Sequence, residues 1–417
     1  MREFFKHGSI VAAGLIGANL LTYIYYALVT RGIGVGQAGE FTSLLSAMVL
    51  LSLPANVVAN VVTKIVADAV GRGFPGTARA MMARLDRWWM YFAIAAALGG
   101  TLASGWIAAF FHVGDPRVVA LAIVGFIFTF PMQPQRCVIQ GKAAFVPYSI
   151  SQLIESSVKA GAGLLLLTVG GGLLLALGGY VLGVVASFCY NAFWGSRQEG
   201  PAQEKSPDMT FAVTLIGIAL PIGAITMITF TDVIIVEHNL SRHVAGLYGA
   251  SALVGRAIST VIAFVWVVLL PKAAARRAAG LPTVDLLQAA MLASGAILGT
   301  ALLVTGFFPT LVITVLAGKS FAEGSGLIFP YAIAMSALGL ASVLASYLIA
   351  VGRTWFGIPL TCAAIGEVVA LSLYHPDVWA VLRIVIAGHG AVLACALAGV
   401  ALALVHEKRV LGGPLET

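Results

Sequence analysis

The sequence predicts an all-α, polytopic membrane protein with about twelve transmembrane helices in two pseudo-symmetric six-helix lobes. Hydrophobic residues make up 60% of the 417 residues and charged residues only 10%, whereas soluble domains carry roughly 25% charged residues. Apolar stretches of about 20 residues recur along the chain, which is the length that a helix needs to cross the hydrocarbon core. These stretches are continuously apolar and do not alternate as the strands of a membrane barrel do.

Twelve apolar ranges are long enough to be transmembrane helices, and each is bounded by polar residues, Gly or Pro. The predicted spans are residues 8–30, 41–66, 88–111, 118–138, 146–168, 172–194, 210–232, 244–270, 286–308, 325–350, 355–373 and 379–405.

The positive charges predict the orientation. The chain has 24 Lys and Arg residues, and four of them, Lys64, Lys159, Arg256 and Arg383, lie within or at the edge of spans. On one side the loops carry only Arg31, Arg117, Arg242 and Lys319, so the other side carries the remaining sixteen. Because cytoplasmic loops are enriched in Lys and Arg, this bias predicts a cytoplasmic membrane protein with both termini in the cytoplasm.

The longest polar linker divides the chain almost in half. We predict an N-lobe at residues 1–195 with spans one to six, a cytoplasmic linker at 196–208, and a C-lobe at 209–417 with spans seven to twelve. Gly39 and Gly246 occupy similar motifs 207 residues apart, and Gly141 and Gly352 do so 211 residues apart. These offsets predict a duplication with both halves in the same orientation.

Several function classes are disfavoured. The basic residues, which give a net charge of +7, lie in short loops and follow membrane topology, so we expect no nucleic-acid partner. The four cysteines form no C-x-x-C pair and the seven histidines show no ligand spacing, so we expect no metal and no cofactor. The loops are too short for a soluble catalytic domain, which argues against an enzyme.

Polar residues recur at helical spacing within several predicted spans. Such residues either bond across helix interfaces or line a water-filled cavity, and the sequence leaves both readings open. Those that we consider for substrate binding are Asn19, Tyr23 and Tyr26 in the first span, Asn56 and Asn60 in the second, and Ser251 in the eighth.

Ionisable residues inside the predicted spans are the stronger functional candidates, since charge in hydrocarbon is costly. Glu155 and Lys159 have the i, i+4 spacing of an ion pair, so a structural role is open for them as well. We predict three substrate-binding cations, Arg256, Lys64 and Lys159, and three residues for cation coupling, Glu155, Asp232 and Glu367. Asp232 and Glu155 are the candidate partners of Arg256.

Short motifs at the openings of spans two and eight resemble a known family. Residues 31–34, Arg-Gly-Ile-Gly, precede 38–41, Ala-Gly-Glu-Phe; in the second half, 232–236, 245–251 and 269–271 form the corresponding stretch. They resemble the polysaccharide and oligosaccharide-lipid flippases of the multidrug/oligosaccharidyl-lipid/polysaccharide exporter superfamily. The resemblance implies two six-helix lobes, alternating access, and a cavity lined by spans one, two, seven and eight.

The resemblance makes a flippase of polyprenyl-diphosphate-linked oligosaccharide or polysaccharide repeat units the leading functional prediction. Membrane lipids and this lipid-linked glycan would be its partners, and an H⁺ or Na⁺ gradient or the membrane potential would drive it. The chain departs from the fourteen-span peptidoglycan-precursor flippases of the superfamily, which have several cavity arginines. Two alternatives stay open: a cation-coupled multidrug or small-molecule exporter, and a membrane-embedded glycan polymerase or ligase.

The charge bias makes the topology testable. Single-cysteine labelling at Gly200, in the linker, and at Gly324, before span ten, should report opposite sides of the membrane. The twelve-span topology places three spans, an odd number, between these two positions. Labelling of both positions from the same side would require an even number of crossings and would therefore contradict this topology.

Overall fold

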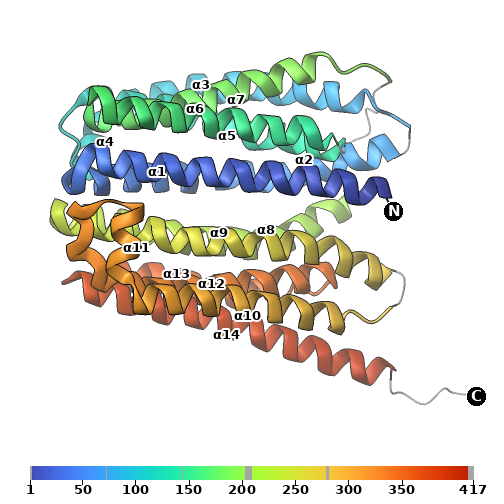
Figure 1. The fold of residues 1–417 in the computed structure, drawn as a ribbon. Helices are drawn as coiled ribbons and strands as arrows, with labels where there is room; N and C mark the ends of the chain where they lie inside the picture. The colour runs from blue at the N-terminus through green and yellow to red at the C-terminus, as the bar shows by residue number, and fades with distance from the viewer. Residues whose placement is uncertain (1, 72, 143, 202–208, 279–280, 412–417) are drawn as a thin grey trace, which may run out of the picture. The chain divides into compact units, whose positions relative to one another are not determined.

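The computed structural model describes residues 2–71, 73–142, 144–201, 209–278 and 281–411, and among these it contains helices and no strand (Figure 1). The first half comprises α1 (Arg2–Leu51), α2 (Leu53–Gly71), α3 (Thr77–Leu102), α4 (Ser104–Phe110), α5 (Pro116–Gly141), α6 (Phe145–Val169) and α7 (Gly172–Ser196). The second half comprises α8 (Met209–Asn239), α9 (Arg242–Ala278), α10 (Val284–Phe307), α11 (Pro309–Leu316), η1 (Lys319–Gly324), α12 (Ser325–Ala350), α13 (Gly357–Leu373) and α14 (Val378–Leu411).

Every predicted span coincides with one or two helices apart from a few residues, so the chain is an all-α, multi-pass integral membrane protein as predicted. In the described part, nine helices are long and apolar enough to cross a membrane, or ten when α3 and α4 count as one bent span. The prediction of about twelve exceeds this count for two reasons. Helix α1 contains the first predicted span and the beginning of the second, and α13 is apolar but only 17 residues long.

Helix α1 is two helices joined at a glycine. Gly34 has φ 73° and ψ 179°, which is not helical and is a conformation that only glycine adopts at low cost. The second predicted span therefore begins in the last part of α1 and continues in α2 after a one-residue interruption at Ser52. Pro54, in the first turn of α2, has no N–H to donate to the preceding turn, which accounts for the interruption.

The third predicted span is bent. Helices α3 and α4 meet at Ala103 with a 65° change in direction. The bend follows Gly99 and Gly100, and the hydroxyl of Ser104 donates to the carbonyl of Thr101 at 2.7 Å. Glycine and serine residues are common causes of sharp kinks, because they weaken the regular ladder of backbone hydrogen bonds.

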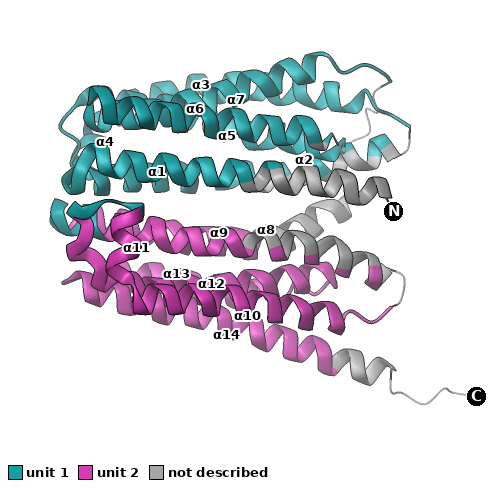
Figure 2. Cartoon of the chain, in the orientation of Figure 1, with its two compact units in different colours: residues 1–212, 241–247, 316–320 teal, residues 213–240, 248–315, 321–417 magenta. Residues whose placement is uncertain are grey.

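The chain forms two compact units (Figure 2). Unit 1 contains residues 1–212 with the short segments 241–247 and 316–320, and unit 2 contains 213–240, 248–315 and 321–417. In unit 1, α6 packs against α1 and α7, and α5 packs against α2 and α7; in unit 2, α12 and α13 pack against α14. The predicted lobe boundary stays a prediction, since residues 202–208 of the linker lie outside the described residues.

Helices α6 and α7 approach closely along a pair of glycines, as the G-x-x-x-G spacing of Gly179 and Gly183 predicts. A Cβ atom on Gly179 would lie 2.5 Å from the Cβ of Ala162, and one on Gly183 would lie 2.7 Å from the backbone oxygen of Glu155. This interface therefore depends on the absence of side chains at both positions. It also brings α7 against the part of α6 that carries Glu155 and Lys159.

We expect Gly183→Ala to destabilise the protein, because the added methyl group must push α7 away from α6. Overpacking of this kind costs ~1–3 kcal/mol and should lower the unfolding midpoint of the purified protein in detergent. Gly178→Ala is the matched control: it gives α7 the same gain in helix propensity, and its Cβ would lie 3.6 Å from Leu121, an ordinary contact. Equal midpoints for the two variants would show that the close approach is not needed.

Candidate functional site

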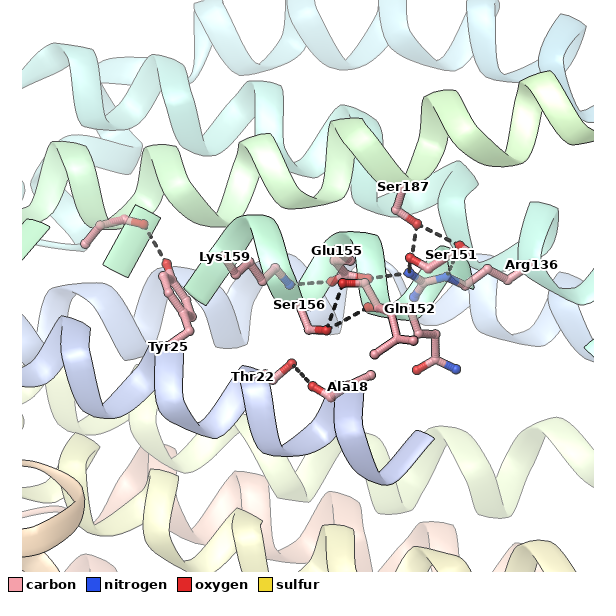
Figure 3. A network of polar contacts seen from close by, with 12 residues as sticks. Ala18, Thr22, Tyr25, Arg136, Ser151, Gln152, Glu155, Ser156, Lys159 and Ser187 are labelled. Carbon is pink, nitrogen blue, oxygen red and sulfur yellow. Dashed lines mark hydrogen bonds and ion pairs between the residues drawn. The ribbon is translucent and has the colours of Figure 1, made fainter. Parts of the chain in front are cut away.

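Two clusters of buried polar side chains lie within the membrane-spanning helices, one in each unit. The cluster in unit 1 joins α5, α6 and α7 around Arg136 (Figure 3). The cluster in unit 2 joins α8, α9, α12, α13 and α14 around two carboxylates, Asp232 and Glu367.

Arg136 is buried near the end of α5 and makes four hydrogen bonds. Its Nη2 donates to Glu155 Oε2 at 2.5 Å, to Ser187 Oγ at 2.8 Å and to the carbonyl of Ser151 at 3.1 Å, and its Nε donates to Ser151 Oγ at 3.0 Å. The sequence reading counted Arg136 among the cytoplasmic charges and missed this role. A positive residue at the end of a span gives no sign, by itself, of turning inward.

Glu155 bonds a second cation, Lys159, one helical turn further along α6. The ammonium group of Lys159 also lies 3.9 Å from the centre of the Tyr180 ring, in a cation–π contact. The cluster thus holds two cations around one carboxylate, and the predicted i, i+4 ion pair of Glu155 and Lys159 is present. Both residues make these contacts, although the sequence predicted substrate binding for Lys159 and cation coupling for Glu155.

The polar stripe of the first span lies on α1, next to a tyrosine that the sequence reading did not select. Tyr25 is fully buried and donates to the carbonyl of Ala176 at 2.6 Å, which ties α1 to α7 (Figure 3). The rings of Tyr23 and Tyr26 pack edge to face at 6.2 Å, and Asn19 is half-buried. The Tyr25 contact joins two helices, whereas the Tyr23–Tyr26 contact lies within α1, so the substrate-binding role of Asn19, Tyr23 and Tyr26 stays a prediction.

The second-span candidates are only partly covered. Asn56 is half-buried on α2, and the side chains of Asn60 and Lys64 lie outside the described residues. The prediction that these side chains line a central aqueous cavity stays a prediction.

Unit 2 contains a buried carboxylate held by three helices. Asp232, on α8, is fully buried, and its Oδ2 accepts hydrogen bonds of 2.8 Å from the hydroxyls of Tyr248 on α9 and Tyr331 on α12. Arg256 Nη2, on α9, lies 3.7 Å from Oδ1. The predicted pairing of Arg256 with Asp232, one of two candidates, is therefore present at ion-pair distance.

Arg256 is oriented by two further contacts on α8. Its Nε donates to the carbonyl of Thr229 at 3.2 Å, and its guanidinium carbon lies 4.4 Å from the centre of the Phe230 ring. The side chain is 12% exposed, whereas that of Asp232 is 0% exposed. Ser251, also on α9, is buried. The arginine thus covers the carboxylate and keeps part of its own surface open.

Glu367 has a partner that the sequence reading missed. His389, on α14, lies with Nε2 3.4 Å from Glu367 Oε1 on α13, and both side chains are 0% exposed. Its other ring nitrogen, Nδ1, lies 3.1 Å from the carbonyl of Ala334 on α12. One feature of the sequence is consistent with this position: His389 lies between Gly388 and Gly390, so neither neighbouring residue has a side chain.

Unit 1 also has a pocket of about 300 Å³, which shares no lining residue with either cluster. None of the predicted site residues lines it. Its four charged residues form two opposite pairs: Arg242 lies 3.6 Å from Glu40 and Arg117 lies 2.9 Å from Asp115. The hydrogen bonds from Arg117 lower the pKa of the exposed Asp115 carboxyl below its usual value. Because its charges are paired, this pocket offers a weaker candidate site than the buried clusters.

Comparison with solved structures identifies the fold. The chain matches an inward-facing multidrug resistance MATE family transporter of the MOP superfamily with a TM-score of 0.69 at 12% identity, over 93% of this chain and 94% of that one. The fold is that of the MATE transporters. The eukaryotic MATE transporter AtDTX14 matches with a TM-score of 0.63 at 12% identity, over 96% and 95% of the two chains. No family model and no curated protein matches this sequence.

A third match shows that this fold occurs with different pockets. A MOP superfamily transporter from Pyrococcus furiosus, described as having a binding pocket of reverse polarity that suggests a different function, matches with a TM-score of 0.52 at 11% identity, over 93% and 94% of the chains. Two of these structures are described as members of the superfamily that the sequence resembles, and at 11–12% identity the likeness shows the fold alone. The first two proteins are described as MATE transporters, and none of the three descriptions names a polysaccharide flippase.

The unit 1 cluster predicts a stability effect. Glu155→Gln keeps the size of the side chain and removes the negative charge, which leaves Arg136 and Lys159 buried without a carboxylate. Removing one partner of a buried ion pair costs ~3–5 kcal/mol, so the unfolding midpoint in detergent should fall sharply.

Asp115→Asn is the control for this experiment. It removes one carboxylate from an exposed ion pair, and asparagine retains the helix-capping role of Asp115. We expect little change in its midpoint, because exposed pairs contribute little. A Glu155→Gln midpoint as high as that of the control would contradict the structural role of the cluster.

Proposed function

We propose that this protein is a cation-coupled exporter of small organic molecules in the cytoplasmic membrane, and that the driving cation acts at Asp232. The observation that carries the proposal is the position of this carboxylate. It is fully buried among membrane-spanning helices and holds Tyr248 on α9 and Tyr331 on α12 while it faces Arg256. Buried ionisable residues in transmembrane helices commonly mark ion and substrate pathways.

The contacts of Asp232 depend on its charge. As a carboxylate it attracts Arg256, and such a pair at about 4 Å is worth ~4 kcal/mol at an effective dielectric constant of ~20. A cation that neutralises the carboxylate removes this attraction and weakens the hydrogen bonds from both tyrosines, since bonds to charged acceptors are the stronger ones. Binding of the cation would therefore loosen the contact among α8, α9 and α12, and the neutral and charged states would favour different packings.

The comparisons support a transporter more than an enzyme. The matched proteins are transporters, and one is described as a multidrug resistance transporter. This description favours small-molecule export as the function to test first. The expected cytoplasmic termini, the H⁺ or Na⁺ gradient and the contact with membrane lipids belong to the same proposal.

A flippase of lipid-linked glycans has less support from the geometry. Its diphosphate needs cations that are available to bind it, and two of the three predicted cations, Arg256 and Lys159, face carboxylates in the structure. The side chain of the third, Lys64, lies outside the described residues. The glycan polymerase or ligase reading has no feature in its favour among the described residues.

The proposal predicts that the Asp232→Asn variant folds but does not couple transport to an ion gradient. The amide oxygen still accepts hydrogen bonds from Tyr248 and Tyr331, while the charge that binds a cation is lost. In proteoliposomes with an imposed H⁺ or Na⁺ gradient, we expect gradient-driven movement of ethidium, a small organic cation, to fall at least about tenfold, within the usual range of coupling energies.

Asp285→Asn serves as the matched control, because Asp285 is an exposed carboxylate paired with Arg276 in the same unit. This variant should transport at the wild-type rate. Gradient-driven transport by Asp232→Asn at the rate of the control would remove Asp232 from the mechanism. An absence of transport by the wild-type protein with ethidium and with a panel of other organic cations would count against the proposed function itself.

A further inference from the structure

Glu367 and His389 form a buried acid–base pair inside unit 2. Both side chains are 0% exposed, and 3.4 Å separates Glu367 Oε1 from His389 Nε2. Among the described residues, neither carboxylate oxygen of Glu367 nor the Nε2 of His389 has a hydrogen-bond partner, so the contact between them is at ion-pair distance without the geometry of a hydrogen bond. The pair joins α13 to α14, and the function proposed for Asp232 does not require it.

The backbone fixes the tautomer of the histidine. A carbonyl oxygen only accepts hydrogen bonds, so the contact of 3.1 Å between His389 Nδ1 and the carbonyl of Ala334 places a hydrogen on Nδ1. The neutral ring then presents an unprotonated Nε2 to Glu367. One proton between these two atoms satisfies both of them, either as a carboxylic acid that donates to the imidazole or as an imidazolium that donates to the carboxylate.

The number of bound protons follows from the burial of the pair. With one proton the pair is neutral overall. Without it, a carboxylate would face an imidazole lone pair with no hydrogen bond and a net charge of −1, and with two protons the net charge would be +1. Both charged states are costly among transmembrane helices, so the closed site favours a single proton.

The surrounding charged and titratable groups reinforce this preference. Asp232 on α8 interacts electrostatically with both Glu367 and His389, and Tyr331 on α12 interacts with Asp232, Glu367 and Arg256. Tyr331 lies one helical turn before Ala334, the residue whose carbonyl holds the histidine. A second negative charge at Glu367 would repel Asp232, so loss of the shared proton and the charge on Asp232 are linked.

The chemistry of the pair suits a proton better than Na⁺. Hard cations such as Na⁺ bind through oxygen ligands, and an imidazole nitrogen suits softer metals. Here one face of the carboxylate is taken by the imidazole.

We propose that Glu367 and His389 bind one proton between them, and that this proton is coupled electrostatically to the cation site at Asp232, so that an H⁺ gradient drives transport. The first part stands on the geometry of the pair alone. The second part rests on the proposed function, because it names the cation that acts in the same unit as Asp232. When the site opens to water, the proton leaves to solvent as hydronium, and the exposed carboxylate and imidazole are then hydrated separately.

The glycines beside His389 provide a matched pair of variants that keep both titratable groups. A Cβ atom on Gly388 would lie 2.1 Å from Glu367 Oε2, so Gly388→Ala must displace the carboxyl group. A Cβ atom on Gly390 meets no atom within 4 Å, so Gly390→Ala adds a methyl group to the same helix with no effect on the pair.

Proton binding can be measured without transport, by infrared difference spectroscopy of the purified full-length protein during pH titration. In the wild type we expect the Glu367 carboxyl band and the His389 imidazole band to change at one common midpoint. The Glu367→Gln and His389→Gln variants assign the bands, and each should shift the midpoint of the group that remains. Gly388→Ala should separate the two midpoints by about one pH unit or more, the shift that a tenfold change in coupling produces, and Gly390→Ala should retain the wild-type titration.

Three results would overturn proton sharing: independent titration of the two groups, identical spectra for Gly388→Ala and Gly390→Ala, or a midpoint that moves when KCl is replaced by NaCl at constant ionic strength. Transport tests the second part separately. Wild-type transport should follow an H⁺ gradient and not a Na⁺ gradient, and Gly388→Ala should reduce it relative to Gly390→Ala. Transport driven by Na⁺ alone would overturn the assignment of the driving ion and leave the exporter function standing, whereas the spectra decide proton binding even in a protein that moves no tested substrate.

Discussion

The cost of a charge within apolar helices constrains the whole interior of this protein. A single charged side chain at the centre of a bilayer costs ~2.5–3.5 kcal/mol on insertion scales, so each buried carboxylate needs partners from neighbouring helices. Glu155 obtains them from α5 and from its own helix, Asp232 from α9 and α12, and Glu367 from α14. The polar contacts therefore help to determine which helices pack together in each unit. The apolar surfaces alone do not specify this pairing.

These carboxylates differ in how completely they are compensated. Glu155 faces two cations, Arg136 and Lys159, and two serine hydroxyls complete the hydrogen bonds of the arginine. Removing or adding a proton there leaves charges without partners, which favours a permanent structural role. Asp232 is held mainly by two neutral hydroxyls, and Glu367 by an imidazole that can itself accept a proton. Their charge can change at a lower cost, so unit 2 has the residues suited to an ion-driven change of state.

Much of the fold could be predicted because hydropathy acts locally. Each predicted span coincides with one or two helices apart from a few residues. The close approach at Gly179 and Gly183 and the pairing of Glu155 with Lys159 follow from spacing on one helix. The residues that were missed, Arg136, Tyr331 and His389, act through partners on other helices, 15 to 99 positions away in the chain. Periodicity gives the face of a helix on which a residue lies, but it does not give the helix that covers this face. The Asp232–Arg256 pair could be named only because a buried arginine requires an acid.

The arrangement of α12 links the two carboxylates of unit 2. Tyr331 donates to Asp232, and the carbonyl of Ala334, one turn further on, holds His389 against Glu367. A movement of α12 that lengthens one contact changes the other, and the electrostatic interaction of Asp232 with both members of the pair acts in the same direction. Linkage is reciprocal: if neutralising Asp232 changes the affinity of the Glu367–His389 pair for its proton, then loss of that proton changes the affinity of Asp232 for a cation by the same factor. Two sites coupled in this way can exchange one bound charge for another, which is the requirement for a transporter driven by an ion gradient.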